Sequence, residues 1–103
     1  MTLRFRWDEA KAAANERKHR IRFETAARVF ADPFALSEQD RIEGGEYRWQ
    51  TIGSIEGLVV LLVAHAVNDE DEGTHVITII SARRADRSER MRYETEKYRH
   101  LRT

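Results

Sequence analysis

The stretch LVVLLVAHAV, residues 58–67, limits the possible folds of this chain more than any other part of the sequence. It is apolar at every position except His65, so it lacks the alternation of a strand that has one face in water. It is also far shorter than the roughly 20 residues that a membrane-spanning helix needs. A short apolar run of this kind predicts the central strand of a sheet that is covered on both faces.

Four other segments are rich in alternating or β-branched residues, as strands are. They are residues 3–7 (LRFRW), 34–40 (FALSEQD), 47–53 (YRWQTIG) and 75–81 (HVITIIS). The first is short and the second is weak, and both are expected at the edges of the sheet. The joins at residues 44–45, 54–57 and 68–73 are short and turn-like, so neighbouring strands are expected to be antiparallel.

Three segments are expected to be helices, at residues 9–18, 23–31 and about 87–99. Asp8 is suited to cap the first helix, because its short carboxylate can accept from a backbone N–H in the first turn. Asp32 precedes Pro33, which pushes it out of the helical region and ends the second helix. Asp86 and Glu89 have the spacing of a capping box at the start of the third helix.

The first helix has two neighbouring faces of different character. Its alanines at positions 10, 13 and 14 form a narrow apolar face that is expected to pack on the sheet. Beside this face runs a stripe of four residues at helical spacing, which would line or brace a groove at the helix edge: Trp7, Lys11, Asn15 and Lys18.

The predicted elements combine into an α+β fold. Two N-terminal helices would pack on an antiparallel sheet of about four to five strands, and a C-terminal helix would follow. The length of 103 residues fits a single domain, 1–103. Arg83 and Arg84 would lie in the turn between the last strand and the last helix.

The net charge of zero hides a strong segregation along the chain. Residues 1–31 carry a net charge of +4, residues 32–72 of −8 and residues 73–103 of +4. If both ends fold onto one face, that basic face would suit an anionic partner such as nucleic acid. The acidic part would suit a basic protein, although solvated helices with many charges would give the same composition.

Several classes of function lack their motifs here. The chain has no cysteine, which excludes disulfides and thiolate zinc sites, and it lacks nucleotide-binding and hydrolase motifs. The four histidines have no metal-ligand spacing, so neither a metal nor another cofactor is expected. The N-terminus has no apolar signal core. These features favour a cytoplasmic protein without a membrane association.

The basic residues indicate a different chemistry, metal-free cleavage of RNA. In that reaction a base removes the proton of a 2′-hydroxyl, an acid protonates the leaving 5′ oxygen, and cations stabilise the phosphate. The candidate catalytic residues are Lys18, His19, Arg48, His65 and Arg83, and the candidate substrate-binding residues are Lys11, Asn15, Arg84 and Tyr93.

Each candidate also has a purely structural interpretation. Lys18 and His19 could serve only to end a helix, where a cation is favourable. Arg48 could pair with a nearby carboxylate, and Arg83 or Arg84 could be a solvated charge. His65 and Tyr93 could be core residues. Trp7 and Trp49 are interpreted as packing residues, as most tryptophans are.

Two long motifs together resemble the BrnT family of type II toxins. The first is WDEAKAAANERKH at residues 7–19, and the second is ISARRADRSERMRYE, which begins at Ile80. The segments IRFETAARVFADP and RWQTIG lie between them in the family's order. The resemblance covers roughly residues 5–95.

This resemblance implies a RelE-like fold and a metal-independent ribonuclease that halts translation. It further implies a BrnA-like antitoxin with a ribbon-helix-helix domain, in a 2:2 heterotetramer that binds operator DNA through the antitoxin. The chain departs from the family at Arg20, where a glycine is common, and at Arg22, where a Ser-like cap is common. An arginine at the first position carries a conformational penalty if the helix ends in a left-handed residue.

Two other functions remain open from the sequence. RelE-like folds also include ParE-like toxins, which block DNA gyrase by binding and do not cut RNA. The basic face could also belong to a plain protein-interaction module that docks an acidic partner.

Overall fold

The computed structural model describes residues 2–102 of the chain. The segments predicted as strands and helices all form, in the predicted order. The strands are β1 (Thr2–Arg6), β2 (Leu36–Glu43), β3 (Glu46–Ile55), β4 (Val59–Asp71) and β5 (Thr74–Arg84). The helices are α1 (Glu9–His19), α2 (Phe23–Ala26) with the continuing 3₁₀ helix η1 (Ala27–Ala31), and α3 (Arg87–Arg102).

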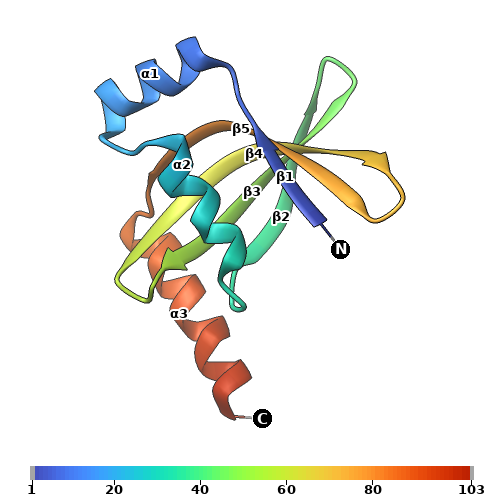
Figure 1. Ribbon diagram of the computed structural model, residues 1–103. Helices are drawn as coiled ribbons and strands as arrows, with labels where there is room; N and C mark the ends of the chain where they lie inside the picture. The colour runs from blue at the N-terminus through green and yellow to red at the C-terminus, as the bar shows by residue number, and fades with distance from the viewer. Residues whose placement is uncertain (1, 103) are drawn as a thin grey trace.

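The five strands form one mixed sheet in the order β1-β5-β4-β3-β2 (Figure 1). The apolar strand β4 lies in the middle, as predicted, with antiparallel neighbours on both sides. The expectation of a wholly antiparallel sheet is wrong, because β1 pairs with β5 in parallel. A parallel pair needs a long crossover connection, and here residues 7–73 separate the two strands.

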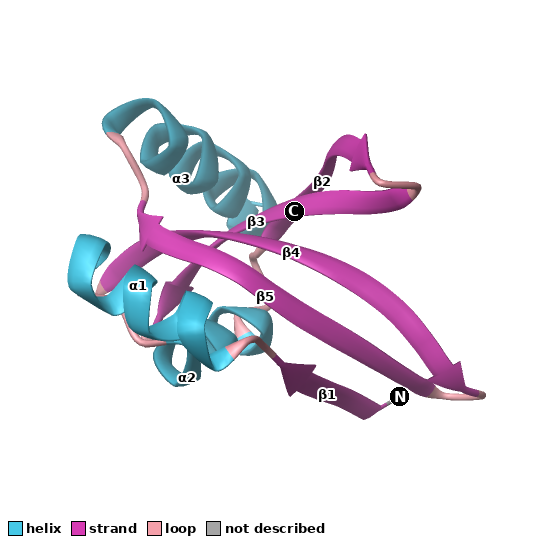
Figure 2. Cartoon of the chain, turned by 90° about the horizontal axis from the view of Figure 1, so that it is seen from above, coloured by secondary structure: helices cyan, strands magenta, loops and turns pink. Residues whose placement is uncertain are grey.

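Helices cover both faces of the sheet (Figure 2). On one face, α2 and η1 pack Phe23, Ala26 and Val29 against Leu61 and other side chains of the central strands. On the opposite face, Tyr93 of α3 packs in a smaller cluster with Ile52 and Leu62. The two terminal helices do not share a face, since α1 and α3 lie on different sides of the sheet (Figure 2).

Helix α1 begins and ends as its sequence predicts. The Asp8 carboxylate accepts a hydrogen bond from the backbone N–H of Lys11 at 3.0 Å. Arg20 follows the last turn in the left-handed conformation, with φ at 61°. A glycine would adopt this conformation without strain, whereas a side chain raises the energy of a left-handed backbone.

The packing face of α1 differs from the prediction. Ala10, Ala13 and Ala14 are all exposed, whereas Asn15 is buried and Ala12 half-buried. The helix therefore contacts the rest of the protein along the face that contains Asn15. Trp7 packs edge-on against Phe23, which confirms its interpretation as a packing residue.

The second helix ends at Asp32, as predicted. Next to it, η1 approaches β3 closely at Gly53, where a Cβ atom would lie 2.7 Å from a methyl carbon of Val29. A larger residue at position 53 would push η1 away from the sheet. Arg22 precedes α2 and makes no capping hydrogen bond through its side chain.

The β4–β5 hairpin is longer than predicted at both ends. β4 continues through Asp71, so most of the segment expected to be a turn is strand. β5 continues through Arg84, so Arg83 and Arg84 belong to the strand and not to the turn that follows.

The capping box is confirmed: the Glu89 N–H donates to the Asp86 carboxylate, and the Asp86 N–H donates to the Glu89 carboxylate. Among the helices of residues 2–102, none is long and apolar enough to cross a membrane.

Candidate nucleic-acid interface

The side chain of Asn15 joins α1 to the open edge of β5. Its amide NH₂ donates to the carbonyl of Ala82 at 2.9 Å and to that of Ile21 at 3.0 Å. Its amide oxygen accepts from the N–H of Ala82 at 3.0 Å. β1 pairs with β5 only as far as Thr78, so Asn15 satisfies edge groups that no strand reaches.

This contact brings the end of α1 to the end of β5 (Figure 1). Lys18 and His19 occupy the last turn of α1, and Arg83 and Arg84 are the last residues of β5. We call Lys18, His19, Arg20, Arg83 and Arg84 the basic corner. Residues 17–22 and 83–90, which surround it, contain eight basic and two acidic residues. The corner is thus the most cationic end of the molecule.

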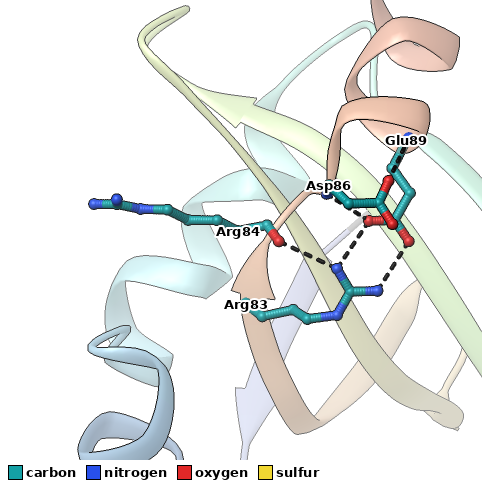
Figure 3. A network of polar contacts seen from close by, with 4 residues as sticks. All are labelled: Arg83, Arg84, Asp86 and Glu89. Carbon is teal, nitrogen blue, oxygen red and sulfur yellow. Dashed lines mark hydrogen bonds and ion pairs between the residues drawn. The ribbon is translucent and has the colours of Figure 1, made fainter.

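Arg83 is held in place by Glu89 of α3 (Figure 3). Its two terminal nitrogens donate to the two carboxylate oxygens at 2.8 and 2.9 Å, and one also donates to the Arg84 carbonyl. The paired guanidinium lowers the pKa of Glu89 below its usual value, so this carboxylate stays charged. Arg83 is therefore fixed, and the Glu89 carboxylate balances its charge.

Arg84 is the freer of the two arginines. It is exposed, and its side chain extends away from Arg83 and Glu89 (Figure 3). Lys18 is exposed and His19 is half-buried. The corner consequently offers cationic groups to solvent on elements that are themselves fixed by Asn15 and Glu89.

Arg48 lies away from the basic corner. It is on β3, two strands away from Arg83 of β5, which is a separation of about 10 Å across the sheet. It also lies four residues away in the direction of the strands, which is a further separation of about 13 Å along them. Its guanidinium lies 3.3 Å from Glu46, which fits the carboxylate-pair interpretation. Its Nε is buried without a hydrogen-bond partner among the described residues.

His65 is a core residue and not a surface one. It is 3% exposed, its ring stands edge-on to Phe30, and its Nε2 lies 2.7 Å from the hydroxyl of Thr51. Burial lowers its pKa to about 4, so the ring is neutral at pH 7. These contacts fit the interpretation of His65 as a core residue, and the ring lies outside the basic corner.

Tyr93 and Asn15 also have structural positions. Tyr93 is 2% exposed, and its hydroxyl donates to Asp32 at 2.5 Å and lies 3.0 Å from the Ser54 hydroxyl. Burial and the Asp32 carboxylate raise the pKa of Tyr93. The polar atoms of both side chains are occupied by the protein itself, which favours a structural role for both residues.

The remaining candidate, Lys11, is exposed on α1 one turn before Asn15, outside the basic corner. Arg20 was missed as a site residue, although its place directly after Lys18 and His19 was a sufficient signal. Arg6 was also missed: it lies on β1 and donates to the Thr78 hydroxyl at 3.0 Å. The alternation of LRFRW places it on the face opposite Phe5, the face that α3 covers only in part.

Comparison with known protein families shows to which family the chain with this basic corner belongs. A family model described as a ribonuclease toxin, BrnT, of a type II toxin–antitoxin system matches residues 7–89. The chain belongs to the BrnT family. The matched range begins at Trp7 and ends at Glu89, so it contains Lys18, His19, Arg83 and Arg84.

A solved structure supports the fold of this BrnT family member. The crystal structure of the Brucella abortus ribonuclease toxin BrnT is similar with a TM-score of 0.63 and 21% sequence identity. The similarity covers 84% of this chain and 100% of the Brucella chain. None of the curated proteins that were compared matches the chain. The chain therefore shares the BrnT architecture of a mixed five-stranded sheet with three helices.

Proposed function

We propose that this BrnT family member is an endoribonuclease toxin that binds and cuts RNA at the basic corner. The observation that carries the proposal is the Asn15 contact, which holds the Lys18–His19 end of α1 beside the Arg83–Arg84 end of β5. The family's ribonuclease description supplies the reaction type. The net positive charge of the corner supplies the attraction for the phosphate backbone.

The chemistry follows from what each group can do. The guanidinium of Arg84 would stabilise the extra negative charge on the phosphate as the 2′-hydroxyl attacks it. Arg83, oriented by Glu89, would hold the same or the next phosphate. His19 would accept the proton of the 2′-hydroxyl and return it to the leaving 5′ oxygen, with Lys18 as a second cation. The products would be a 2′,3′-cyclic phosphate and a free 5′-hydroxyl.

The substrate path extends beyond the corner in this proposal. Arg48 and Arg6 lie on the sheet face that α3 covers only in part, and both side chains are partly or fully exposed. Their distance from Arg83 corresponds to more than one nucleotide, so they would bind flanking phosphates and take no part in the cleaved bond. Lys11 would lie too far along α1 for a direct role.

The wider function proposed is that of the toxin of a toxin–antitoxin pair. We further propose that cleavage needs no resident metal ion. It would inhibit translation in the cytoplasm. A BrnA-like antitoxin would neutralise the toxin in a 2:2 complex and bind operator DNA.

The test is cleavage of single-stranded RNA by the purified chain in the presence of a chelator. We expect fragments ending in 2′,3′-cyclic phosphate, and a loss of at least about 100-fold in rate when Arg83 and Arg84 are both changed to Ala. The matched control is Arg99→Ala, an exposed arginine that pairs with Glu96 on α3. Intact RNA with the wild-type chain, with or without ribosomes, would rule out the catalytic proposal.

A further inference from the structure

The sheet divides into two separate hairpins at the end opposite the basic corner (Figures 1 and 2). The pairing between β3 and β4 reaches only Trp49 and His65. Beyond that level β2 and β3 stay paired as far as Glu43 and Glu46, and β4 and β5 as far as Asp71 and Thr74. The facing edges of the two hairpins therefore have no partner strand among the described strand pairs.

Large apolar side chains are exposed on one face of this divided end. Ile42 and Tyr47 oppose each other across the β2–β3 hairpin and are 58% and 55% exposed. Val67 of β4 is 38% exposed, and Leu3 of the neighbouring strand β1 is 39% exposed. Because side chains alternate along a strand, Tyr47 and Val67 lie on the same face of the sheet as His65. In the part of the sheet nearer to the basic corner, η1 covers this face.

The charge around these side chains has the sign opposite to that of the basic corner. Among the described side chains at the ends of the two hairpins, those of residues 40–46, 69 and 72 include five acidic and one basic. An acidic surface repels RNA and DNA, so it is unsuited to the substrate. It also disfavours a second copy of this chain docking there through the same surface, because like charges would face each other.

We propose that this acidic, apolar hairpin end is the docking surface for the antitoxin, through a basic segment with apolar side chains. An antitoxin is the partner that membership of a toxin–antitoxin family implies. The exposed apolar side chains supply the buried anchors that stable interfaces need, and the acidic rim selects a basic partner and speeds its association. The open edges of the hairpins add backbone groups that an extended segment can pair with.

The docking proposal rests on the antitoxin partner of the proposed function and not on RNA cleavage. Antitoxin affinity and RNA cleavage are therefore measured separately, so that each proposal has its own test. The chain is co-expressed with the product of the reading frame adjacent to its own gene, and the affinity of the purified pair is measured. The variant Ile42→Ser with Tyr47→Ser removes two exposed apolar side chains without touching the core. We expect it to bind about 30-fold more weakly or worse and to keep its thermal unfolding midpoint and its RNA cleavage.

The matched control changes two other exposed apolar residues, which lie away from the hairpin end. Leu58 lies in the β3–β4 turn and Met91 on the outer side of α3, and they are 86% and 54% exposed. Leu58→Ser with Met91→Ser should leave the affinity unchanged. A second variant, Glu43→Lys with Asp69→Lys, should weaken binding most at low salt, because it acts through charge.

Three outcomes would overturn the proposal. One is unchanged affinity in the Ile42 and Tyr47 double variant. Another is loss of binding in the Leu58 and Met91 control, which would place the antitoxin on another surface. The last is a wild-type chain that self-associates through the hairpin end and binds no product of the adjacent reading frame. Loss of RNA cleavage alone would leave the docking proposal unaffected and count only against the ribonuclease.

Discussion

A single amide, that of Asn15, satisfies three backbone groups and thereby positions the basic corner. Changing Asn15 to Ala would leave the N–H and carbonyl of Ala82 and the carbonyl of Ile21 without their partner. We expect a loss of about 3 kcal/mol in the free energy of unfolding, roughly 1 kcal/mol for each lost bond. Urea unfolding of the variant measures this loss.

Asn68→Ala is the control for this prediction, because Asn68 is an exposed residue of β4. Its change should shift the free energy of unfolding by less than about 0.5 kcal/mol. Equal losses in the two variants would mean that the Asn15 contact does not stabilise the fold.

Arg20 ends helix α1 with a strained, left-handed backbone. Its left-handed φ of 61° is unfavourable for a residue with a Cβ atom. Arg20→Gly is therefore expected to raise the free energy of unfolding by about 1 kcal/mol. Arg17→Gly, inside the same helix, should instead lower it by about 1 kcal/mol. Thermal unfolding of the pair checks the prediction, and shifts of the same sign would contradict it.

The buried ring of His65 makes stability depend on pH. In the unfolded chain this imidazole takes up a proton near pH 6.5, whereas in the folded protein its pKa is about 4. The unfolded state therefore binds more protons between these two values, so stability falls as the pH falls through this range. The loss is on the order of 3 kcal/mol at the acid end.

His65→Gln tests this pH dependence, because a glutamine can keep a hydrogen bond to Thr51 but does not titrate. We expect the variant to lose the decline in unfolding free energy between pH 6.5 and 4 that the wild type shows. His100→Gln, which changes an exposed histidine, should keep the decline. An identical slope in the wild type and in His65→Gln would show that another group controls it.

At the scale of elements, local patterns predicted which segments form strands and helices but not how they pair. The residues of β1 alternate as a strand does, yet nothing local indicates that its neighbour is β5 at the other end of the chain. The alanines of α1 suggested the wrong packing face, because the spacing of apolar residues cannot indicate a face that packs through a polar side chain. The buried residue is Asn15, whose burial depends on hydrogen bonds to a distant strand.

Only part of the candidate site was predictable, because local sequence patterns do not show which distant segments come together. Lys18 and His19 follow from the helix end, and Arg83 and Arg84 from the end of the last strand. That these four residues meet at one corner follows only from the contact between Asn15 and Ala82. His65 and Arg48 were grouped with them because their residue types suit the chemistry, whereas the sheet places them elsewhere.

Helix α3 depends on Glu89 at its start, since this side chain both caps the helix and holds Arg83. Glu89→Ala is expected to lower the free energy of unfolding by about 2 kcal/mol, because a cap and a charge-assisted pair are lost together. Glu94→Ala on the exposed side of the same helix should change it by less than about 0.5 kcal/mol. Urea unfolding compares the two, and equal effects would mean that the Arg83 pair adds nothing.

Across the whole molecule, a formal net charge of zero separates into a cationic end and an anionic end. The basic corner lies where β5 ends, and the acidic hairpin ends lie where β5 begins. Such a polarity orients the protein toward a phosphate backbone before contact, and the attraction is lost in salt. If RNA binds at the corner, removal of one of its cations must therefore reduce the salt dependence of binding.

This expectation has a measurable size. Each phosphate contact with a single strand contributes about 0.7 to the slope of log affinity against log salt concentration, so Arg84→Ala should lower the slope by about 0.7. Single-stranded RNA with 2′-O-methyl riboses serves as the probe, because it cannot be cut by attack of the 2′-hydroxyl. Arg99→Ala removes an equal charge from the exposed side of α3 and should leave the slope unchanged. Equal reductions in the two variants would mean that RNA senses only the total charge, and the basic corner would then not be the binding site.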